Sequence, residues 1–399
     1  RFFEKSLKAL KKLNDRVRLA NIYNNMTMVY SISGKNDLAI NLSLKAEMIY
    51  KDLDDRIRLS NVYGQMGNIS MNMNNQIDMF KNKWWYNNIA NIKKILVTDR
   101  DKYIYDLNTV DLKCKNISKN LSHVKKYFYA MKANSNIEVL YCIYNNGFGF
   151  ECVSIEEIYY IKNVINGNPD ILFTPNYCTI NEYVIAFELN CTVIVDNEEV
   201  LINNPLIFSG KSIGLRLDLN IGDGHHVKVI TEGYESKFGI ALDRIPYILQ
   251  YCSMKNIKIV GLHSHRGSDI NNISNWENAI KLLKNISLSF NDIKWINIGG
   301  GFGTELKNNN LHNLNQILDN ELDIWIEPGR YLVSEAGILV SKVLYLKKSI
   351  RNNFAIIDAG MNDLVRPAMY DSEHSIDTVQ KTQNAKQNYT VVGPICETA

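Results

Sequence analysis

The sequence lacks three features that would place it in a specialised class of protein. Its seven cysteines are scattered and form no C-x-x-C pair, which argues against a disulfide framework and a structural zinc site. No run of 18 or more apolar residues occurs, and residues 1–19 contain no apolar stretch typical of a signal peptide. The net charge of +3 is spread along the chain, so no basic face for nucleic acid is evident. These absences predict a cytoplasmic protein without a nucleic-acid or membrane partner.

The length and the ends of the chain set further bounds. At 399 residues, of which 46% are hydrophobic, the chain is long enough for two or three domains. It begins at Arg1 rather than at a methionine, and it ends at Ala399 directly after a motif-like segment, so we expect a fragment truncated at both termini. His225 and His226 are adjacent and no third ligand has zinc spacing, so no metal is expected.

An internal repeat with a period of about 40 residues occupies the first eighty residues. LNDRVRLANIYNNM (13–26) aligns closely with LDDRIRLSNVYGQM (53–66). Apolar periodicity over 16–32 and 38–50, interrupted near Gly34, predicts a helix-turn-helix unit. Such a unit must stack on a neighbour to bury its apolar stripe. The pattern resembles tetratricopeptide-type repeats, and it predicts either a helical cap or spacer, or a groove for a protein partner.

From Tyr127 the chain alternates short β-rich runs with longer helical patterns, which is typical of a parallel sheet. Eight strand-helix units in about 200 residues fit a (β/α)8 barrel better than an open sheet, and barrel enzymes carry their chemistry at the carboxyl ends of the strands. The predicted strands are 128–131, 148–152, 171–174, 192–195, 213–217, 259–263, 295–298 and 324–326.

The segments on either side of the barrel predict a small β domain. Residues 102–105 read as a lone strand, and 337–347 and 354–358 read as strands with no helix between them. The full prediction is an α/β chain with four parts. These are a helical repeat segment at 1–80, a linker with the first part of the β domain at 81–120, the barrel at 121–335, and a truncated C-terminal β domain at 336–399.

Polar motifs follow several of these strands. FYAMKAN (128–134) ends a strand at Lys132, and GFGFECVS (147–154) places a carboxylate at the end of the next. HSHRGS (263–268) combines imidazoles with a hydroxyl, and EPGR (327–330) combines a carboxylate with a guanidinium. INIGGGFG (296–303) carries three glycines whose backbone N–H groups can close on a phosphate. Taken singly, a lysine at a strand end or a glycine cluster is often only a solvated charge or a tight turn. Together, and with phosphate recognition common after barrel strands seven and eight, they predict a phosphorylated cofactor.

The ordered set of motifs resembles the fold-type III decarboxylases that depend on pyridoxal phosphate. The closest similarity is to the diaminopimelate decarboxylase family, especially the decarboxylase half of bifunctional aspartate kinase/diaminopimelate decarboxylases. It covers residues 84–399 and leaves out the first eighty. It implies an alanine-racemase-like architecture, a TIM barrel with a flanking β domain. The motifs are FYAMKAN, GFGFECVS, LFTPN, GDGHH, SKFG, HSHRGS, GGGFG, EPGRYLVSEAG, DAGMNDLVRPAMYDS and VVGPICET.

This resemblance assigns a role to each candidate residue. Lys132 would hold pyridoxal 5'-phosphate as a Schiff base, Cys396 would donate a proton, and both would be catalytic. The other cofactor-binding residues would be Glu151 near the ring, His265 stacked on it, Glu327 at its nitrogen, and Ser268, Gly299, Gly300, Gly301, Gly329 and Arg330 around the phosphate. The substrate would be held by Arg330, Arg366, Tyr370 and Glu397. The resemblance also implies a homodimer, in which Cys396 would reach into the partner subunit's active site.

The implied reaction is decarboxylation of meso-2,6-diaminopimelate to L-lysine, the last step of lysine biosynthesis. Arg366 suits a distal carboxylate and Glu397 suits a distal ammonium, which ornithine-type substrates do not combine. The alternatives are a related ornithine or arginine decarboxylase, a racemase, and a non-catalytic repeat scaffold that binds the cofactor. Arg266 and Asp269 depart from the apolar residue and the Gly or Gln expected in that loop.

Overall fold

The computed structural model divides the chain into two compact units, Arg1–Val97 and Thr98–Ala399. The described residues are 10, 15–32, 36–56, 58–59, 61–62, 65–66, 83–95, 102–220, 237–318, 321–349, 352–370, 372–379 and 387–395. The motif GDGHH, Ser236 of SKFG, Cys396 and Glu397 lie outside them. Across these ranges, no helix is both long enough and apolar enough to cross a bilayer.

The first unit contains two helices that lie side by side, α2 (Arg16–Ile32) and α3 (Asn36–Asp52), and their bounds agree with the predicted helix-turn-helix. The fully buried Ala20 and Ala46 leave room for close approach of the helices, and Tyr50 closes the contact by donating a hydrogen bond to Asn21 Oδ1 at 2.7 Å. Val62, from the second copy of the repeat, is buried in the same apolar cluster. The helices α5 (Trp84–Asn87) and α6 (Ile89–Ile95) also fall in this unit. The likeness to tetratricopeptide repeats stays a prediction.

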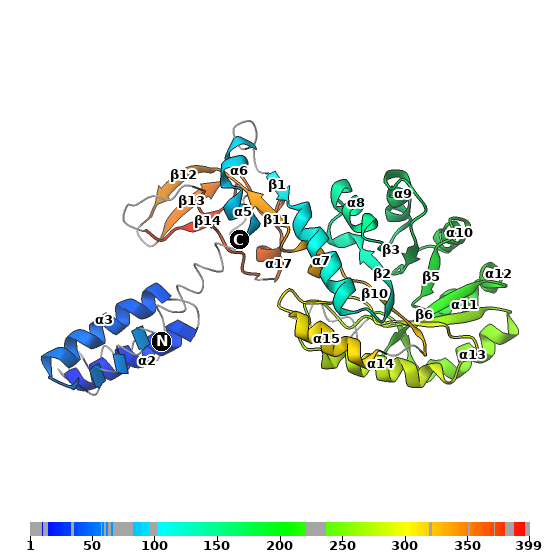
Figure 1. Cartoon of the computed structure of the whole chain (residues 1–399), viewed down its shortest axis with the longest axis horizontal. Helices are drawn as coiled ribbons and strands as arrows, with labels where there is room; N and C mark the ends of the chain where they lie inside the picture. Colours follow the sequence, from blue (N-terminus) through cyan, green and yellow to red (C-terminus); the bar gives the residue numbers. More distant parts are fainter. Residues whose placement is uncertain are drawn as a thin grey trace. The chain divides into compact units, whose positions relative to one another are not determined.

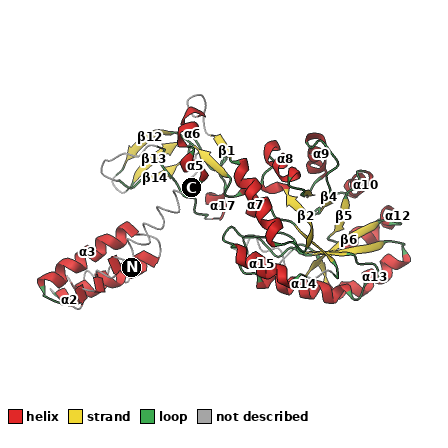
Figure 2. Cartoon of the chain, in the orientation of Figure 1, coloured by secondary structure: helices red, strands yellow, loops and turns green. Residues whose placement is uncertain are grey.

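Eight parallel strands of the second unit close into a barrel (Figures 1 and 2). They follow one another around the barrel in chain order, and the pairings β5–β6 and β10–β2 complete the closure. The short β7 (Ile240–Ala241) pairs with β6 beside the ring. All eight predicted strands are confirmed. The barrel strands are β2 (Val124–Ala130), β3 (Gly149–Cys152), β4 (Ile171–Phe173), β5 (Thr192–Val195), β6 (Ser212–Asp218), β8 (Lys258–His263), β9 (Trp295–Asn297) and β10 (Asp323–Ile326).

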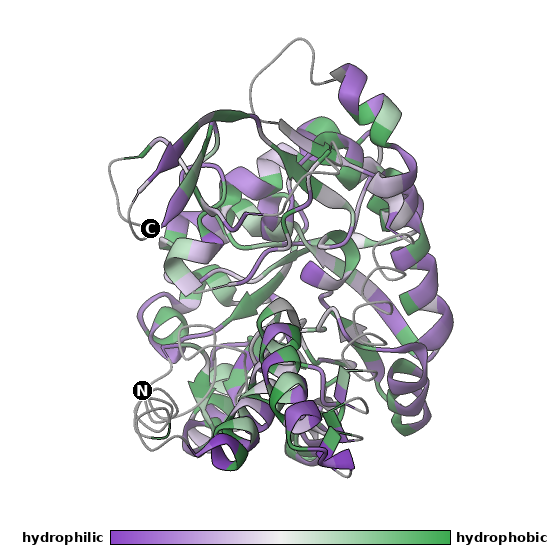
Figure 3. Ribbon diagram, turned by 90° about the vertical axis from the view of Figure 1, so that its left-hand side faces the viewer, coloured by the Kyte–Doolittle hydropathy of each residue, from purple (hydrophilic) through white to green (hydrophobic). Residues whose placement is uncertain are grey.

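Amphipathic helices cover the outside of the barrel. In α14, the buried residues Trp276, Ala279, Ile280 and Leu283 recur at the spacing of one helical face. Figure 3 shows the helices banded green and purple, as this pattern requires. The helices and 3-10 turns are α7 (Leu107–Asn120), η1 (Met131–Ala133), α8 (Ile137–Asn145), α9 (Ile155–Val164), α10 (Ile180–Glu188), α11 (Glu198–Asn203), α12 (Pro205–Phe208), η3 (Leu242–Arg244), α13 (Ile245–Met254), α14 (Ser274–Ser287), α15 (Asn308–Ile317) and α16 (Arg330–Val333).

The interior of the barrel is filled by aromatic rings that lie against glycines. Trp295 and Trp325 stack with centroids 4.1 Å apart, and Phe128 packs on the same cluster. A Cβ at Gly261 would lie 2.2 Å from the Trp295 ring, and one at Gly214 would lie 2.5 Å from it. Glycine at these two interior positions is therefore what allows a tryptophan to fit inside a barrel of this size.

The barrel lining becomes polar at the carboxyl ends of the strands, two residues after the interior glycines and tryptophans. The register supports a common orientation, since Arg216 pairs with His263 and His263 pairs with Asn297 on successive strands. Every member is at most 8% exposed. We call these residues the polar ring: Glu151, Thr174, Asp196, Arg216, His263, Asn297 and Glu327.

The predicted small β domain is present and draws on both flanks of the barrel. β1 (Lys102–Tyr105) pairs antiparallel with β11 (Gly337–Val340), which confirms the lone strand before the barrel and its partner after it. A second sheet has β13 (Asn353–Ile357) between β12 (Val343–Lys348) and β14 (Thr390–Val392). The short helix α17 (Arg366–Tyr370) follows β13 and carries two of the predicted substrate residues.

Candidate active site

Lys132 and Glu151 form an ion pair at the mouth of the barrel. Lys132 lies in η1, immediately after β2, and its Nζ is 3.0 and 3.1 Å from the two carboxylate oxygens of Glu151 on β3. The Lys132 side chain is 53% exposed, so a ligand can reach its amino group, whereas Glu151 is 2% exposed. The protein groups around the amino group desolvate it and oppose its charged form, but Glu151 and Glu327 outweigh that effect and hold the pKa of Lys132 above the ordinary lysine value.

Glu327 is held by two partners of the polar ring. His263 Nε2 lies 3.0 Å from Glu327 Oε1, and Asn297 Nδ2 donates to the same oxygen at 2.8 Å. Burial favours the neutral acid, but the interaction with His263, including its hydrogen bond, and the nearby Lys132 hold the pKa of Glu327 below its ordinary value. Glu327 is therefore an ionised carboxylate inside the barrel.

The three glycines after β9 form a tight turn beside the loop that follows β8. Gly299 and Gly301 have φ of +70° and +83°, which L side chains rarely adopt. The two loops are joined at Ile270, whose N–H donates to the Gly301 carbonyl at 2.8 Å and whose carbonyl accepts from the Gly303 N–H at 2.9 Å. A Cβ at Gly300 would lie 2.3 Å from the Glu327 carbonyl, so the turn also requires a glycine there.

His265 and Ser268 lie in the loop after β8, which faces this glycine turn. The Gly300 N–H donates to His265 Nδ1 at 3.2 Å, which fixes the orientation of the imidazole. Burial, together with the nearby Arg216 and Lys132, lowers the pKa of His265 to about 3. The imidazole is therefore neutral at physiological pH. A neutral ring can stack on a cationic heterocycle without charge repulsion.

The predicted substrate residues that the structure describes gather beside the same loop. Arg330 Nη1 lies 3.2 Å from Asp269 Oδ2, so the aspartate that departs from the expected sequence has a partner. Burial and the proximity of Arg366 lower the pKa of Arg330, which places the two guanidinium groups within electrostatic reach. Tyr370 is also close enough to Arg330 to influence its pKa electrostatically. Arg366 Nη2 donates a hydrogen bond to Ser372 Oγ at 3.3 Å. Two cations and a phenol thus share one side of the site.

Sequence reasoning missed part of the polar ring. It identified Glu151 and Glu327, and the structure brings them together with Lys132, His265 and the glycine turn as expected. The members to which the sequence assigned no role are Thr174, Asp196, Arg216, His263 and Asn297. They could have been recognised from the alternation of side chains along a strand. Each lies two positions after an apolar or glycine residue that faces the barrel interior.

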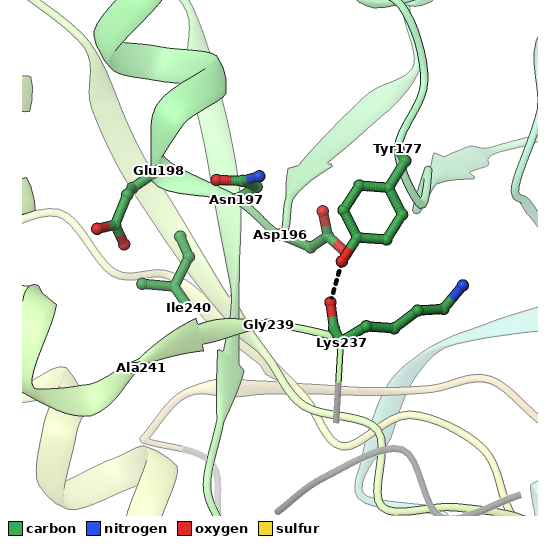
Figure 4. Close-up of a pocket in the computed structure, with 8 residues that line it drawn as sticks. All are labelled: Tyr177, Asp196, Asn197, Glu198, Lys237, Gly239, Ile240 and Ala241. Carbon is green, nitrogen blue, oxygen red and sulfur yellow. Dashed lines mark hydrogen bonds between the residues drawn. The ribbon is translucent and has the colours of Figure 1, made fainter. Parts of the chain in front are cut away.

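A cavity of about 230 Å³ is lined by residues that follow β4 and β5 and by the segment that leads into β7 (Figure 4). The Tyr177 hydroxyl donates to the Lys237 carbonyl at 2.5 Å across its wall. Asp196 reaches into it, and burial raises the pKa of this carboxyl above its usual range although Arg216 and His263 oppose the shift. This cavity follows strands other than β9 and β10, which carry the glycine turn and Glu327.

Comparison with known proteins identifies this arrangement. Residues 107–334 match the family described as the pyridoxal-dependent decarboxylase, pyridoxal binding domain. Diaminopimelate decarboxylase from Aquifex aeolicus is 32% identical over 289 residues, which cover 68% of this chain and 69% of that protein. The chain belongs to the diaminopimelate decarboxylase family. The enzyme from Deinococcus radiodurans is 29% identical over 299 residues, which cover 74% of this chain and 77% of that protein.

The family's fold agrees with the structure. The crystal structure of diaminopimelate decarboxylase from Helicobacter pylori complexed with L-lysine superposes with a TM-score of 0.69 at 28% identity. It covers 77% of this chain and 82% of that chain. Membership in this family makes pyridoxal phosphate the cofactor. The residues present fit it, because an accessible amine, a buried carboxylate and a glycine turn converge at one end of the barrel.

Proposed function

We propose that this chain decarboxylates meso-2,6-diaminopimelate to L-lysine and carbon dioxide, with Lys132 as the lysine that binds pyridoxal phosphate. The observation that supports Lys132 most directly is its half-exposed side chain, whose Nζ lies 3.0 Å from Glu151 and within electrostatic reach of Glu327. Lys126, on the preceding strand β2, is instead paired with Asp170 at 2.6 Å, and its Nζ lies 5.3 Å from the centre of the Trp325 ring. The family relationship supports the reaction, and the contacts of Lys132 support its assignment as the reactive amine.

The residues around Lys132 each have a physical task. When bound, pyridoxal phosphate acts as an electron sink for the bond between Cα and the carboxylate. Glu327, kept ionised by His263 and Asn297, would favour a protonated pyridine nitrogen. Lys132 must release a proton before its nitrogen can attack an aldehyde, and the Glu151 carboxylate is placed to accept it. Neutral His265 would cover one face of the ring.

The phosphate would be held by the glycine turn, Ser268 and the backbone at Gly329 and Arg330. The φ angles of Gly299 and Gly301 leave the backbone free of side chains at the carboxyl end of the strand, where phosphates are commonly bound in barrels. A Cβ at Gly329 would lie 3.1 Å from Ala130, so this backbone also runs close to the end of β2 and to Lys132.

Arg366 and Arg330 support a substrate with a second carboxylate. Their guanidinium groups repel each other across a partly buried space, and a carboxylate between them would relieve that repulsion. Ornithine and arginine lack a distal carboxylate and would leave the repulsion in place. The substrate assignment therefore rests on Arg366, whereas the cofactor assignment rests on Lys132.

The direct test incubates the protein with pyridoxal phosphate and each candidate substrate, and measures carbon dioxide and the amine product. We expect turnover of meso-diaminopimelate and little or none of ornithine or arginine. Arg366→Gln should raise KM for diaminopimelate and leave cofactor affinity unchanged. Turnover of ornithine with none of diaminopimelate would reject the substrate assignment, and the absence of any cofactor binding would reject the enzyme assignment.

We also propose the family's homodimer, with Cys396 as proton donor and Glu397 as a substrate ligand in the partner subunit's site. Mixing Lys132→Ala with Cys396→Ala protein tests this arrangement. If sites are shared, some mixed dimers contain one intact site, so activity should reappear on mixing. Two inactive proteins that stay inactive after exchange of subunits would contradict it.

The four-part domain division and the cytoplasmic location are likewise proposals. The boundaries proposed at 80, 120 and 335 are supported by the change from helical to strand-rich patterns. A protein partner for the helical repeats is supported by the exposed apolar side chains of Met28, Val29 and Met48 on α2 and α3. Limited proteolysis that cuts first inside the barrel rather than between residues 66 and 102 would argue against the proposed domain division.

A further inference from the structure

We propose that Thr174 is a positioning residue for the Lys132–Glu151 pair, a role that rests on the proposed function of Lys132. Thr174 belongs to the polar ring, is 6% exposed, and follows β4 directly. Its hydroxyl donates a hydrogen bond to Oε1 of Glu151. Its motif, LFTPN, is one of those that resemble the family, but the sequence assigned Thr174 no role in the site.

The position of Thr174 is fixed by its own backbone. The Thr174 N–H donates to the Cys152 carbonyl at 2.9 Å, which ties the residue to the end of β3, one residue after Glu151. The register of β3 and β4 continues this pairing, because Glu151 lies opposite Leu172, two residues before Thr174. The hydroxyl is therefore presented to the carboxylate by the barrel sheet itself, not by a mobile loop.

The physical need for this hydroxyl comes from the burial of Glu151. A carboxylate that is 2% exposed requires hydrogen-bond donors, and Lys132 supplies one to both oxygens. Lys132 would not remain a constant donor, because in its proposed role its nitrogen would be occupied in holding the cofactor. Thr174 would be the donor that stays the same whether or not the lysine nitrogen is available. We infer that it keeps Oε1 in place, so that Oε2 stays directed at the lysine nitrogen.

The test removes the hydroxyl while keeping the shape of the side chain. Loss of a hydrogen bond to a charged group corresponds to about a 10- to 100-fold effect. Thr174→Val should therefore slow the capture of added pyridoxal phosphate by the apo-protein by at least about tenfold, followed by absorbance. It should lower kcat and leave KM for diaminopimelate nearly unchanged. Thr174→Ser, which restores the hydroxyl, should capture the cofactor at close to the wild-type rate.

Two controls separate this role from a general effect on folding. Thr192→Val changes the same residue type at the amino end of β5, the opposite end of the barrel, and should leave capture unchanged. Thr174→Ala is a second test in case the valine variant fails to fold. It adds no volume, and it should slow capture of the cofactor as much as Thr174→Val. Wild-type rates in both the Val and Ala variants, or equal slowing in the Ser and Val variants, would overturn the proposal. Failure of the wild-type protein to capture the cofactor would instead overturn the proposed function.

Discussion

Replacing Asn297 by leucine tests how the polar ring is joined to the glycine turn. Asn297 is fully buried, donates to Glu327 Oε1 at 2.8 Å, and accepts from the Gly299 N–H at 2.8 Å. Leucine has a similar shape but can make neither bond. The lost hydrogen bond to the charged Glu327 costs about 1.5–3 kcal/mol, and the unpaired Gly299 N–H about 1–3 kcal/mol. We expect the barrel to lose about 3–5 kcal/mol of stability.

The assay is urea denaturation followed by near-ultraviolet circular dichroism, to which the stacked Trp295 and Trp325 should contribute. Because the same change loosens Glu327 and the glycine turn, which would hold the pyridine nitrogen and the phosphate, affinity for pyridoxal phosphate should also fall. Asn315→Leu is the matched control. Asn315 is also buried and accepts from the His123 N–H at 2.9 Å, but it lies on α15 away from the ring. It should lose stability and retain cofactor affinity. A loss below about 0.5 kcal/mol for Asn297→Leu, with unchanged affinity, would refute the reasoning.

Two further predictions concern the barrel interior and acid stability. Gly261→Ala should destabilise the barrel by about 1–3 kcal/mol through overpacking against Trp295, and adding Trp295→Leu should recover part of the loss in thermal unfolding. A rise in Tm for the single variant would contradict the packing argument. Because the folded pKa of Glu327 is depressed, its contribution to stability is present above the ordinary glutamate value of 4.5 and is lost as pH falls towards the folded pKa. Glu327→Gln should therefore reduce the fall in urea midpoint between pH 6 and pH 3, and an unchanged fall would contradict this assignment.

The sequence predicted the barrel strands because they are short, β-prone and separated by helical patterns. Phe128, Ile194 and Trp325 lie on apolar strands that are followed by polar residues. This pattern of a short apolar run with a polar end can be recognised in the sequence alone. The helix pair 16–32 and 38–50 was similarly visible from its apolar spacing. In the β domain, the predicted strands 102–105 and 354–358 correspond to β1 and β13. The predicted strand 337–347 is divided into β11 and β12, and β14 was not predicted.

The connections between ring residues could not be predicted, because they depend on which strands are neighbours in the closed barrel. Asn297 and Glu327 are 30 residues apart in sequence, yet their strands adjoin and their side chains share a hydrogen bond. Thr174 was missed because a hydroxyl at a strand end is common, and only its bond to Glu151 distinguishes it. Asp269 departed from the expected residue, and its ion pair with Arg330 gives that departure a structural explanation. The roles of Cys396 and Glu397 remain predictions from sequence.

The most direct test of the account identifies the lysine that binds the cofactor. The protein is incubated with pyridoxal phosphate, reduced with borohydride to fix the linkage, digested, and its peptides are analysed by mass spectrometry. The account predicts the cofactor-derived mass on Lys132, its loss in Lys132→Ala, and its retention in Lys126→Ala, whose lysine lies on β2 and is paired with Asp170. Labelling of a different lysine in the wild-type protein, or a cofactor absorbance band that persists unchanged in Lys132→Ala, would contradict it.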